Sequence, residues 1–353
     1  MIEQPKQKTK RYYAAANSYK GFISFFDKVF DSKEFDRIYI LKGGPGTGKS
    51  SFMKKIATNF CDQECETDEI YCSSDPKSLD GIIIKKESRR IAIIDGTAPH
   101  ERDAVIPGAI DEIINLGEGW DSRWLIAKRN KICELTEEKA KAYKCAYSYL
   151  KIAGVADEYI MNVCESNFDK SNANIKAERF LDKIKPSENP KLTNRLVSSF
   201  GKYGYYKIRV NDLDPEPNLG VCGDEYSSLL FLKTISETAL SKGLSFIRFV
   251  NPLNVSYLDG LSFDEYRLTI IQSENGAINS SEFMINDKMY FERTRHAKEM
   301  KNDALEEAKR WFSIASELHF ELENIYGEAM NFKFNDEIID KKLLEIKNIL
   351  QIQ

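Results

Sequence analysis

The chain has 353 residues, a formal net charge of −4 at pH 7 and 42% hydrophobic residues. This length allows two domains that each bury a core, and the composition is that of a soluble globular protein. The slight negative charge argues against a general affinity for nucleic acid, and no stretch is long and apolar enough to span a membrane. Because Met1 to Lys6 lead into no apolar segment of signal-peptide length, we expect a cytoplasmic protein.

Apolar and polar patterns predict an alternation of strands and helices, followed by a long helical region. The predicted segments are an apolar, helical stretch at 21–31, buried strands at 38–41, 69–72 and 90–95, a helix from 51 to about 59, and a long helix at 124–164. The strands are of the fully apolar kind that parallel sheets contain. A polar stretch with Pro186 and Pro190 then indicates a junction between two units.

The most informative stretch is the glycine-rich loop, residues 43–48, which lies between the predicted strand at 38–41 and the helix that follows. With Lys49 and Ser50 it matches the pattern G-x-x-x-x-G-K-[ST] at every required position. Glycines allow the backbone to turn tightly and direct its N–H groups at phosphate oxygens. We therefore expect nucleotide binding by Gly43, Gly44, Pro45, Gly46, Thr47, Gly48, Lys49, Ser50 and Ser51, with Lys49 on the phosphates and Ser50 on Mg²⁺.

A second group of candidate residues follows the strand at 90–95. Asp95 ends this strand and is the natural carboxylate for Mg²⁺, although a strand-ending aspartate with no metal is the simpler alternative. The polar loop behind it carries His100, Glu101 and Asp103, which we expect to orient a water or a substrate. For His100 a purely structural hydrogen bond is an equal alternative. Asp75, in the turn at 73–76, is placed where open α/β sheets bind ligands.

The sequence also contains an internal repeat, which predicts two similar units. Residues 219–228 align with residues 42–51 at an offset of 177, and the Leu-Asp-Gly at 258–260 answers the one at 79–81. Two helical seams have the same spacing at an offset of 162, and each consists of seven residues: Ala142, Ala146, Tyr149, Ala153, Ala156, Ile160 and Val163 in the first, and Ala304, Ala308, Trp311, Ala315, Leu318, Leu322 and Ile325 in the second. We expect the seams to pack on each other within the chain or between two chains.

The second copy lacks the residues that phosphate chemistry requires. Glu225 and Tyr226 replace the Gly-Lys pair of the glycine-rich loop, and Gln272 replaces Asp95. The fall in offset from 177 to 162 removes the counterpart of the polar loop as well. Because lysine, aspartate and loop are lost together, we expect all three to serve a single site, in the first unit.

The order of these motifs resembles a family of poorly characterised bacterial ATPases built from two tandem P-loop units. The resemblance covers nearly the whole chain and rests on Gly-Gly-Pro-Gly-Thr-Gly-Lys-Ser-Ser, Cys-Ser-Ser-Asp, Ser-Leu-Asp-Gly and Asp-Gly-Thr-Ala-Pro-His. It implies ATP binding at 43–51 and a magnesium role for Asp95, and it implies no particular substrate. The chain departs from the family pattern at Glu225 and Tyr226, where a second phosphate loop is expected.

We therefore expect an α/β fold of two tandem P-loop NTPase-like units with mainly parallel sheets, each followed by long helices. The units are placed at 1–175 and 195–353, joined by a linker at 176–194. The favoured function is a Mg²⁺-dependent ATPase in which hydrolysis changes the arrangement of the two units. A small-molecule phosphotransferase is one alternative, because Gly96 and not a second acidic residue follows Asp95. A nucleotide-dependent binding module is the other, in which the degenerate second unit and the helical seams recruit a partner protein. Arg89, Arg102 and Arg123 are the candidates for an arginine finger.

Overall fold

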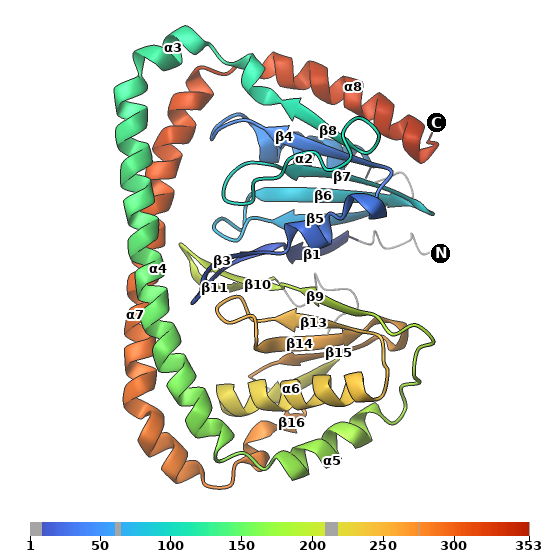
Figure 1. The fold of residues 1–353 in the computed structure, drawn as a ribbon, viewed down its shortest axis with the longest axis vertical. Helices are drawn as coiled ribbons and strands as arrows, with labels where there is room; N and C mark the ends of the chain where they lie inside the picture. Colours follow the sequence, from blue (N-terminus) through green and yellow to red (C-terminus); the bar gives the residue numbers. More distant parts are fainter. Residues whose placement is uncertain (1–8, 61–64, 209–217, 275, 353) are drawn as a thin grey trace, which may run out of the picture.

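The computed structural model describes residues 9–60, 65–208, 218–274 and 276–352. It contains two six-stranded sheets and a pair of long helices that runs alongside both of them (Figure 1). The predicted fold class is confirmed: the chain is mixed α/β, with two mostly parallel sheets that are each followed by long helices. Among the described residues, no helix combines the length and the apolar character needed to cross a membrane.

The two sheets have the same strand order and the same strand directions. The first consists of β8 (Asp111–Asn115), β4 (Arg37–Lys42), β7 (Arg89–Asp95), β6 (Leu79–Lys86), β5 (Glu66–Tyr71) and β1 (Thr9–Tyr13). The second consists of β16 (Ile278–Asn279), β12 (Leu219–Cys222), β15 (Leu268–Gln272), β14 (Leu258–Phe263), β13 (Phe246–Val250) and β9 (Leu192–Arg195). In both, the third, fourth and fifth strands in this order are joined by antiparallel pairs, and the other neighbours are parallel. The internal repeat is therefore a repeat of fold.

Strand β4 lies between β8 and β7 in the first sheet and is buried on both faces. Ile38 and Ile40 contact the aromatic cluster around α1 (Phe26–Val29), whereas Tyr39 and Leu41 contact α2 (Lys49–Phe60) on the opposite face. All four side chains are completely buried. A strand buried on both faces consists mainly of apolar and aromatic residues, and for this reason the sequence alone predicts it.

One local prediction for the first unit differs from the structure. The helix predicted at 21–31 is a strand, β3 (Gly21–Ser24), followed by the one-turn helix α1. Strand β3 pairs antiparallel with β2 (Ala15–Ser18) in a hairpin. The apolar residues of β3 therefore belong to a strand and not to one face of a helix. Residues 79–86 form β6, which runs antiparallel to both of its neighbours and gives the sheet its mixed character.

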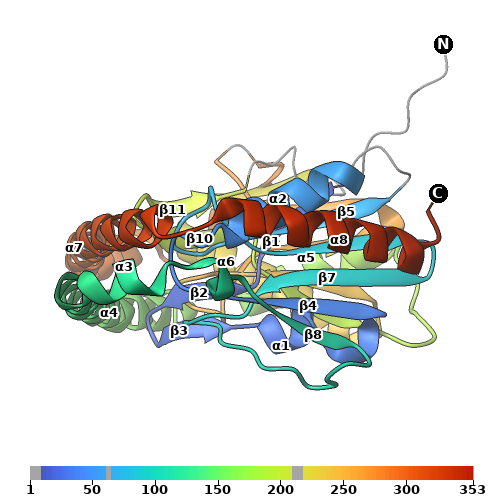
Figure 2. The same ribbon diagram turned by 90° about the horizontal axis from the view of Figure 1, so that it is seen from above.

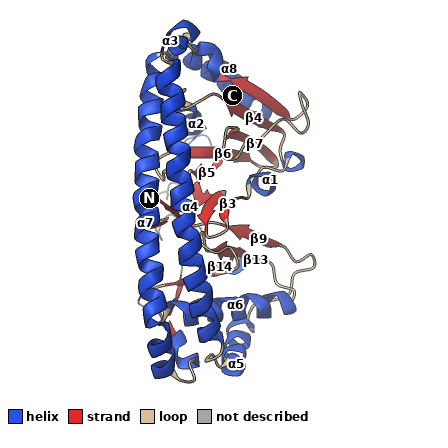
Figure 3. Ribbon diagram, turned by 60° about the vertical axis from the view of Figure 1, so that its left-hand side comes forward, coloured by secondary structure: helices blue, strands red, loops and turns tan. Residues whose placement is uncertain are grey.

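The long helices α4 (Arg129–Glu165) and α7 (Asp287–Glu328) pack along their length in opposite directions (Figures 1 and 3). The predicted seams face each other within one chain. Their alanines are buried, which allows the two backbones to approach closely: Ala142, Ala146, Ala153 and Ala156 on α4, and Ala304, Ala308 and Ala315 on α7. Of the two arrangements expected from the sequence, the structure shows the one within the chain.

The long helices α4 and α7 each run from one repeat to the other, so the helix that follows each of them packs on the opposite repeat. The α3 helix (Ser122–Ala127) and α4 lead from the first sheet to α5 (Lys170–Leu181), which packs on α6 (Glu225–Ser241) of the second. Helix α7 leads back to α8 (Phe332–Leu350), which packs on α2 and on the first sheet (Figures 1 and 2). Each compact half thus contains one helix that follows the long helix of the other repeat: α5 in the second half and α8 in the first.

The small hairpins also contact the opposite repeat. Hairpin β10 (Ser198–Gly201) and β11 (Gly204–Lys207) meets the hairpin β2–β3, and Asn17 Nδ2 donates a hydrogen bond to the carbonyl of Phe200 at 2.8 Å. At the tip of β10, an added Cβ on Gly201 would lie 3.1 Å from the carbonyl oxygen of Ser74. Segments of the second repeat therefore complete the surroundings of the first.

Candidate functional site

The glycine-rich loop follows the carboxyl end of β4 and ends where α2 begins, at Lys49. Gly43, Gly46 and Gly48 have φ angles of +152°, +72° and +81°, a region that side chains disfavour. At Gly46 a Cβ would also lie 2.3 Å from the carbonyl oxygen of Glu323 on α7. Glycine is required here both for the turn and for the close approach of α7.

Lys49 is held inside this loop. Its Nζ donates hydrogen bonds to the carbonyls of Gly43 at 2.9 Å and Gly44 at 3.0 Å, and lies 3.6 Å from Asp95 Oδ2. Both charged side chains are largely buried, at 12% and 15% exposure. The structure thus brings together the lysine and the aspartate that the sequence assigned to one site, with the ammonium group beside the turn.

The neighbours of Lys49 help to fix the loop. Thr47 Oγ1 donates to the carbonyl of Gly44 at 2.9 Å, and Asn335 Nδ2 of α8 donates to the carbonyl of Thr47 at 2.8 Å. Ser50 Oγ accepts a hydrogen bond from the backbone N–H of Leu79 at 3.0 Å. Two helices from the end of the chain, α7 and α8, therefore contact a loop near its beginning.

Asp95 lies in a buried cluster with Asp80 and His100. The ligand atoms of these three residues all lie within 4.8 Å of one another. Asp95 Oδ1 accepts hydrogen bonds from the N–H and the hydroxyl of Thr97, at 2.9 and 2.6 Å. This leaves Oδ2 to face Lys49. A carboxylate pair with an imidazole is a donor set that fits a divalent cation.

Asp80 and Asp95 bring two carboxylates close together in this cluster, and Lys49 lies beside Asp95. Burial raises the pKa of Asp80 well above its ordinary value, and the charge of Asp95 raises it further. Burial lowers the pKa of His100, whose ring stacks on Phe26 with a centroid distance of 4.3 Å. Neither ring nitrogen of His100 has a hydrogen-bond partner among the described residues, and Nε2 lies 3.9 Å from Asp80 Oδ1. The imidazole is therefore neutral and able to accept a cation or a proton.

Glu101 and Asp103 do not join this cluster in the described part of the chain. Glu101 is exposed, and the side chain of Asp103 is 93% exposed and pairs with Lys42 at 3.2 Å. Lys42 Nζ also donates to the carbonyl of Gly96, so this pair lies at the rim of the site. Of the three candidates in the polar loop, only His100 points inward.

Arg89 and Arg102, two of the arginines named from the sequence, are bonded to other segments than the glycine-rich loop. Arg89 pairs with Asp36 at the opposite end of β7, and Arg102 is buried against Ser32. Lys202, between β10 and β11, instead reaches Asp75 at 2.7 Å. Partial burial would raise the pKa of Asp75, but the hydrogen bond from Lys202 lowers it.

A further set of ionisable groups lies on the long helices beside the loop. Lys139 Nζ on α4 is 3.4 Å from His319 Nδ1 on α7, and His319 Nε2 is 3.6 Å from Glu323 Oε1. Burial, together with the charges of Lys139 and Lys49, lowers the pKa of His319 to about 4. Burial and the charge of Asp75 raise the pKa of Glu323. The seam pattern identified these helices as packing elements and carried no signal for this set.

Comparison with protein-family models, curated proteins and solved structures gives no match for this chain. The resemblance to tandem P-loop ATPases thus rests on the motifs themselves. The structure adds that three of those motifs lie together at the same end of the strands of the first sheet. They are the glycine-rich loop after β4, the start of β6 with Asp80 and the end of β7 with Asp95. Asp80 was part of a motif in the sequence but was not assigned to the site, because the antiparallel direction of β6 could not be read from it.

Proposed function

We propose that the chain is an ATP-binding protein and a Mg²⁺-dependent ATPase whose single competent site lies in the first repeat. The observation that supports this most strongly is the buried contact of Lys49 with the turn carbonyls and with Asp95, in a loop whose glycines adopt positive φ angles. A lysine held by weak carbonyl acceptors beside a helix N-terminus can exchange them for phosphate oxygens.

The residues divide into those that hold phosphate and those that hold the metal. In the proposal, backbone N–H groups of 43–48 and the start of α2 hold phosphate oxygens, and Lys49 neutralises their charge. Ser50 and Asp95 provide oxygen ligands for Mg²⁺, which supplies charge stabilisation when it is bound. The raised pKa of Asp80 supports this assignment, since a cation at this place would offset the clustered carboxylates.

His100 and Asp80 are the groups best placed to handle the proton of the attacking water. Both are buried next to Asp95, and the neutral imidazole has two nitrogens without protein partners in the described residues. Glu101 and Asp103, the other candidates for this role, lie outside the cluster. We assign the water-orienting role to His100, whose ring is held by its stacking on Phe26 with a centroid distance of 4.3 Å.

Contacts of the loop with α7 and α8 support a coupling between hydrolysis and the arrangement of the two repeats. The Glu323 carbonyl touches Gly46, and Asn335 binds the carbonyl of Thr47. Any movement of the loop on loss of phosphate is transmitted to α7, which runs the length of the molecule to the second repeat (Figure 3).

Phosphate release from ATP and Mg²⁺ tests the proposal. The wild-type protein is expected to release phosphate without an added acceptor, and Lys49→Ala is expected to abolish this activity. Lys131→Ala, which removes an exposed lysine of α4, serves as the matched control. Release that requires an added hydroxyl compound would instead indicate the phosphotransferase, and nucleotide binding with hardly any turnover would indicate the binding module. Full activity in Lys49→Ala would refute the site.

A further inference from the structure

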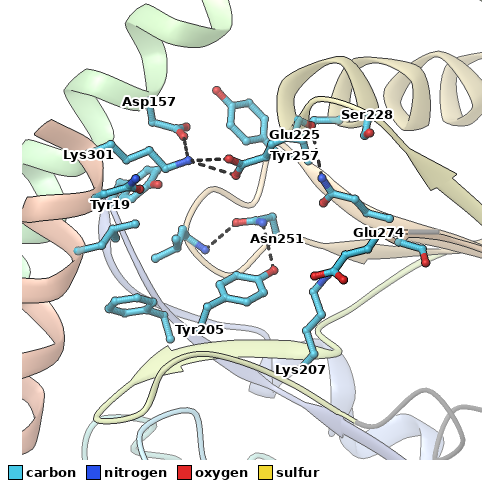
Figure 4. Close-up of a pocket in the computed structure, with 18 residues that line it drawn as sticks. Tyr19, Asp157, Tyr205, Lys207, Glu225, Ser228, Asn251, Tyr257, Glu274 and Lys301 are labelled. Carbon is cyan, nitrogen blue, oxygen red and sulfur yellow. Dashed lines mark hydrogen bonds and ion pairs between the residues drawn. The ribbon is translucent and has the colours of Figure 1, made fainter. Parts of the chain in front are cut away.

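The second repeat contains a cavity of about 500 Å³ at the place that corresponds to the nucleotide site of the first. Gly223, Glu225 and Gln272 line it, and these residues align with Gly46, Gly48 and Asp95. Figure 4 shows Glu225 in the wall of this cavity. A volume in this range is typical of small-molecule sites. The second repeat therefore lacks the residues of a phosphate loop but has a cavity at the corresponding place.

The helix N-terminus beside this cavity is already occupied by carboxylates of the protein. Asp224 Oδ1 accepts hydrogen bonds from the N–H of Tyr226 at 3.0 Å and from the hydroxyl of Tyr290 at 2.7 Å. Its Oδ2 pairs with Lys298 at 2.8 Å. An anionic ligand would meet Asp224 and Glu225 at the position where the first repeat offers N–H groups and a lysine, so the pocket disfavours phosphate.

The charges that line the cavity leave an excess of negative charge. Three carboxylates and two ammonium groups contribute to the wall: Asp157, Glu225, Glu274, Lys207 and Lys301. Lys301 is shared between Asp157 at 3.0 Å and Glu225 at 3.1 Å, so one cation serves two anions. Asp157 is 2% exposed, and its Oδ2 has no hydrogen-bond partner among the described residues. This wall would be stabilised by one further positive charge.

Aromatic rings form much of the remaining wall. Tyr19, Phe200, Tyr205 and Tyr257 all line the cavity. The face of Tyr205 already carries an ammonium group, since Lys207 Nζ lies 5.7 Å from its ring centroid. Ring faces attract cations, most strongly where water is excluded. Asn251, also in the wall, is held by the protein itself: its Nδ2 donates to Asp259 Oδ1 at 2.8 Å, and its Oδ1 accepts from the backbone N–H of Leu253 at 3.0 Å.

Both repeats build this pocket. Tyr19 comes from the turn between β2 and β3 of the first repeat, and its backbone N–H donates to the carbonyl of Leu253 at 2.9 Å. Asp157 comes from α4 and Lys301 from α7. A ligand held here would therefore contact the elements that join the two halves of the molecule.

We infer that this cavity is a binding site for a small organic cation, a molecule of net positive charge whose guanidinium or ammonium group lies beside Glu225 and against the tyrosine rings. The site is separate from the proposed nucleotide site and requires no turnover. Its occupant is defined by chemistry: a positive charge on a compact body that fits about 500 Å³.

Calorimetric titration of the full chain with arginine and with agmatine tests the inference. We expect saturable binding of at least one of them, and weaker or no binding of citrulline, which has the shape of arginine without its charge, and of glutamate. Glu225→Gln, which removes a charge from a half-exposed side chain, should weaken binding at least about tenfold. Glu178→Gln, an exposed change on α5 outside the cavity, should leave it unchanged.

Three results would overturn the inference. The first is that neither cation binds at millimolar concentration to protein with a native circular dichroism spectrum. The second is that citrulline or glutamate binds as tightly as arginine. The third is that Glu225→Gln binds arginine with the wild-type affinity. Because the readout is binding in the absence of nucleotide, a failure of the proposed ATPase would leave the outcome unaffected.

Discussion

Replacing Lys301 by methionine should strongly destabilise the second repeat. The Lys301 side chain is 7% exposed, and its Nζ donates to the hydroxyl of Tyr226 at 2.8 Å besides its contacts with Asp157 and Glu225. Removing one partner of a buried ion pair leaves an uncompensated charge and typically costs about 3–5 kcal/mol. Asp157, at 2% exposure, would carry that charge, whereas the exposed Glu225 could turn toward water.

Urea unfolding followed by circular dichroism measures this loss. Lys131→Met provides the control, because the Lys131–Glu134 pair is half exposed and such a pair contributes about 0–1 kcal/mol. The double variant Lys301→Met with Asp157→Asn removes the orphan charge and should recover much of the stability. A Lys301→Met protein within about 1 kcal/mol of wild type would refute the reasoning, as would a double variant no more stable than the single one.

Three further predictions follow from local geometry. Gly46→Ala should lower the free energy of unfolding, measured with urea, more than Gly108→Ala does. Both positions have positive φ, for which backbone strain of about 1–3 kcal/mol is expected. Only at Gly46 would a Cβ also lie 2.3 Å from the carbonyl oxygen of Glu323. His100 should titrate below its ordinary pKa in an NMR pH titration, since burial lowers its pKa. The folded protein then binds fewer protons than the unfolded chain, so stability falls as pH drops below about 6.5, and His100→Gln should reduce that fall. Ala308→Leu should cost about 1–3 kcal/mol by overpacking the contact between α4 and α7, and an unchanged thermal midpoint would contradict that contact.

The sequence was most informative where a residue type permits only one environment. The apolar run of β4 predicts a strand buried on both faces, and the structure shows one. The spacing of the two helical seams predicts a close helix pair, which α4 and α7 form. The aligned motifs predict two units, and the sheets share one strand order.

The arrangement of the segments in space was less accessible. An apolar seam shows that a helix packs but not against which partner, so the exchange of α5 and α8 between the repeats could not be inferred. Composition also does not set the direction of a side chain in a loop. His100 turns inward to stack on Phe26, while Glu101 and Asp103 in the same loop face solvent. The sequence predicts that Glu225 and Tyr226 cannot bind phosphate. It does not predict the cavity beside them, because residues of both repeats form that cavity.

The number of nucleotides bound per chain tests the central claim most directly. Equilibrium titration with a non-hydrolysable ATP analogue and Mg²⁺ should give one site per chain in the wild type, although the fold contains two repeats. Lys49→Ala should lose this site, and Lys131→Ala should keep it. Two sites per chain, or undiminished binding by Lys49→Ala, would contradict the assignment of a single nucleotide site to the glycine-rich loop.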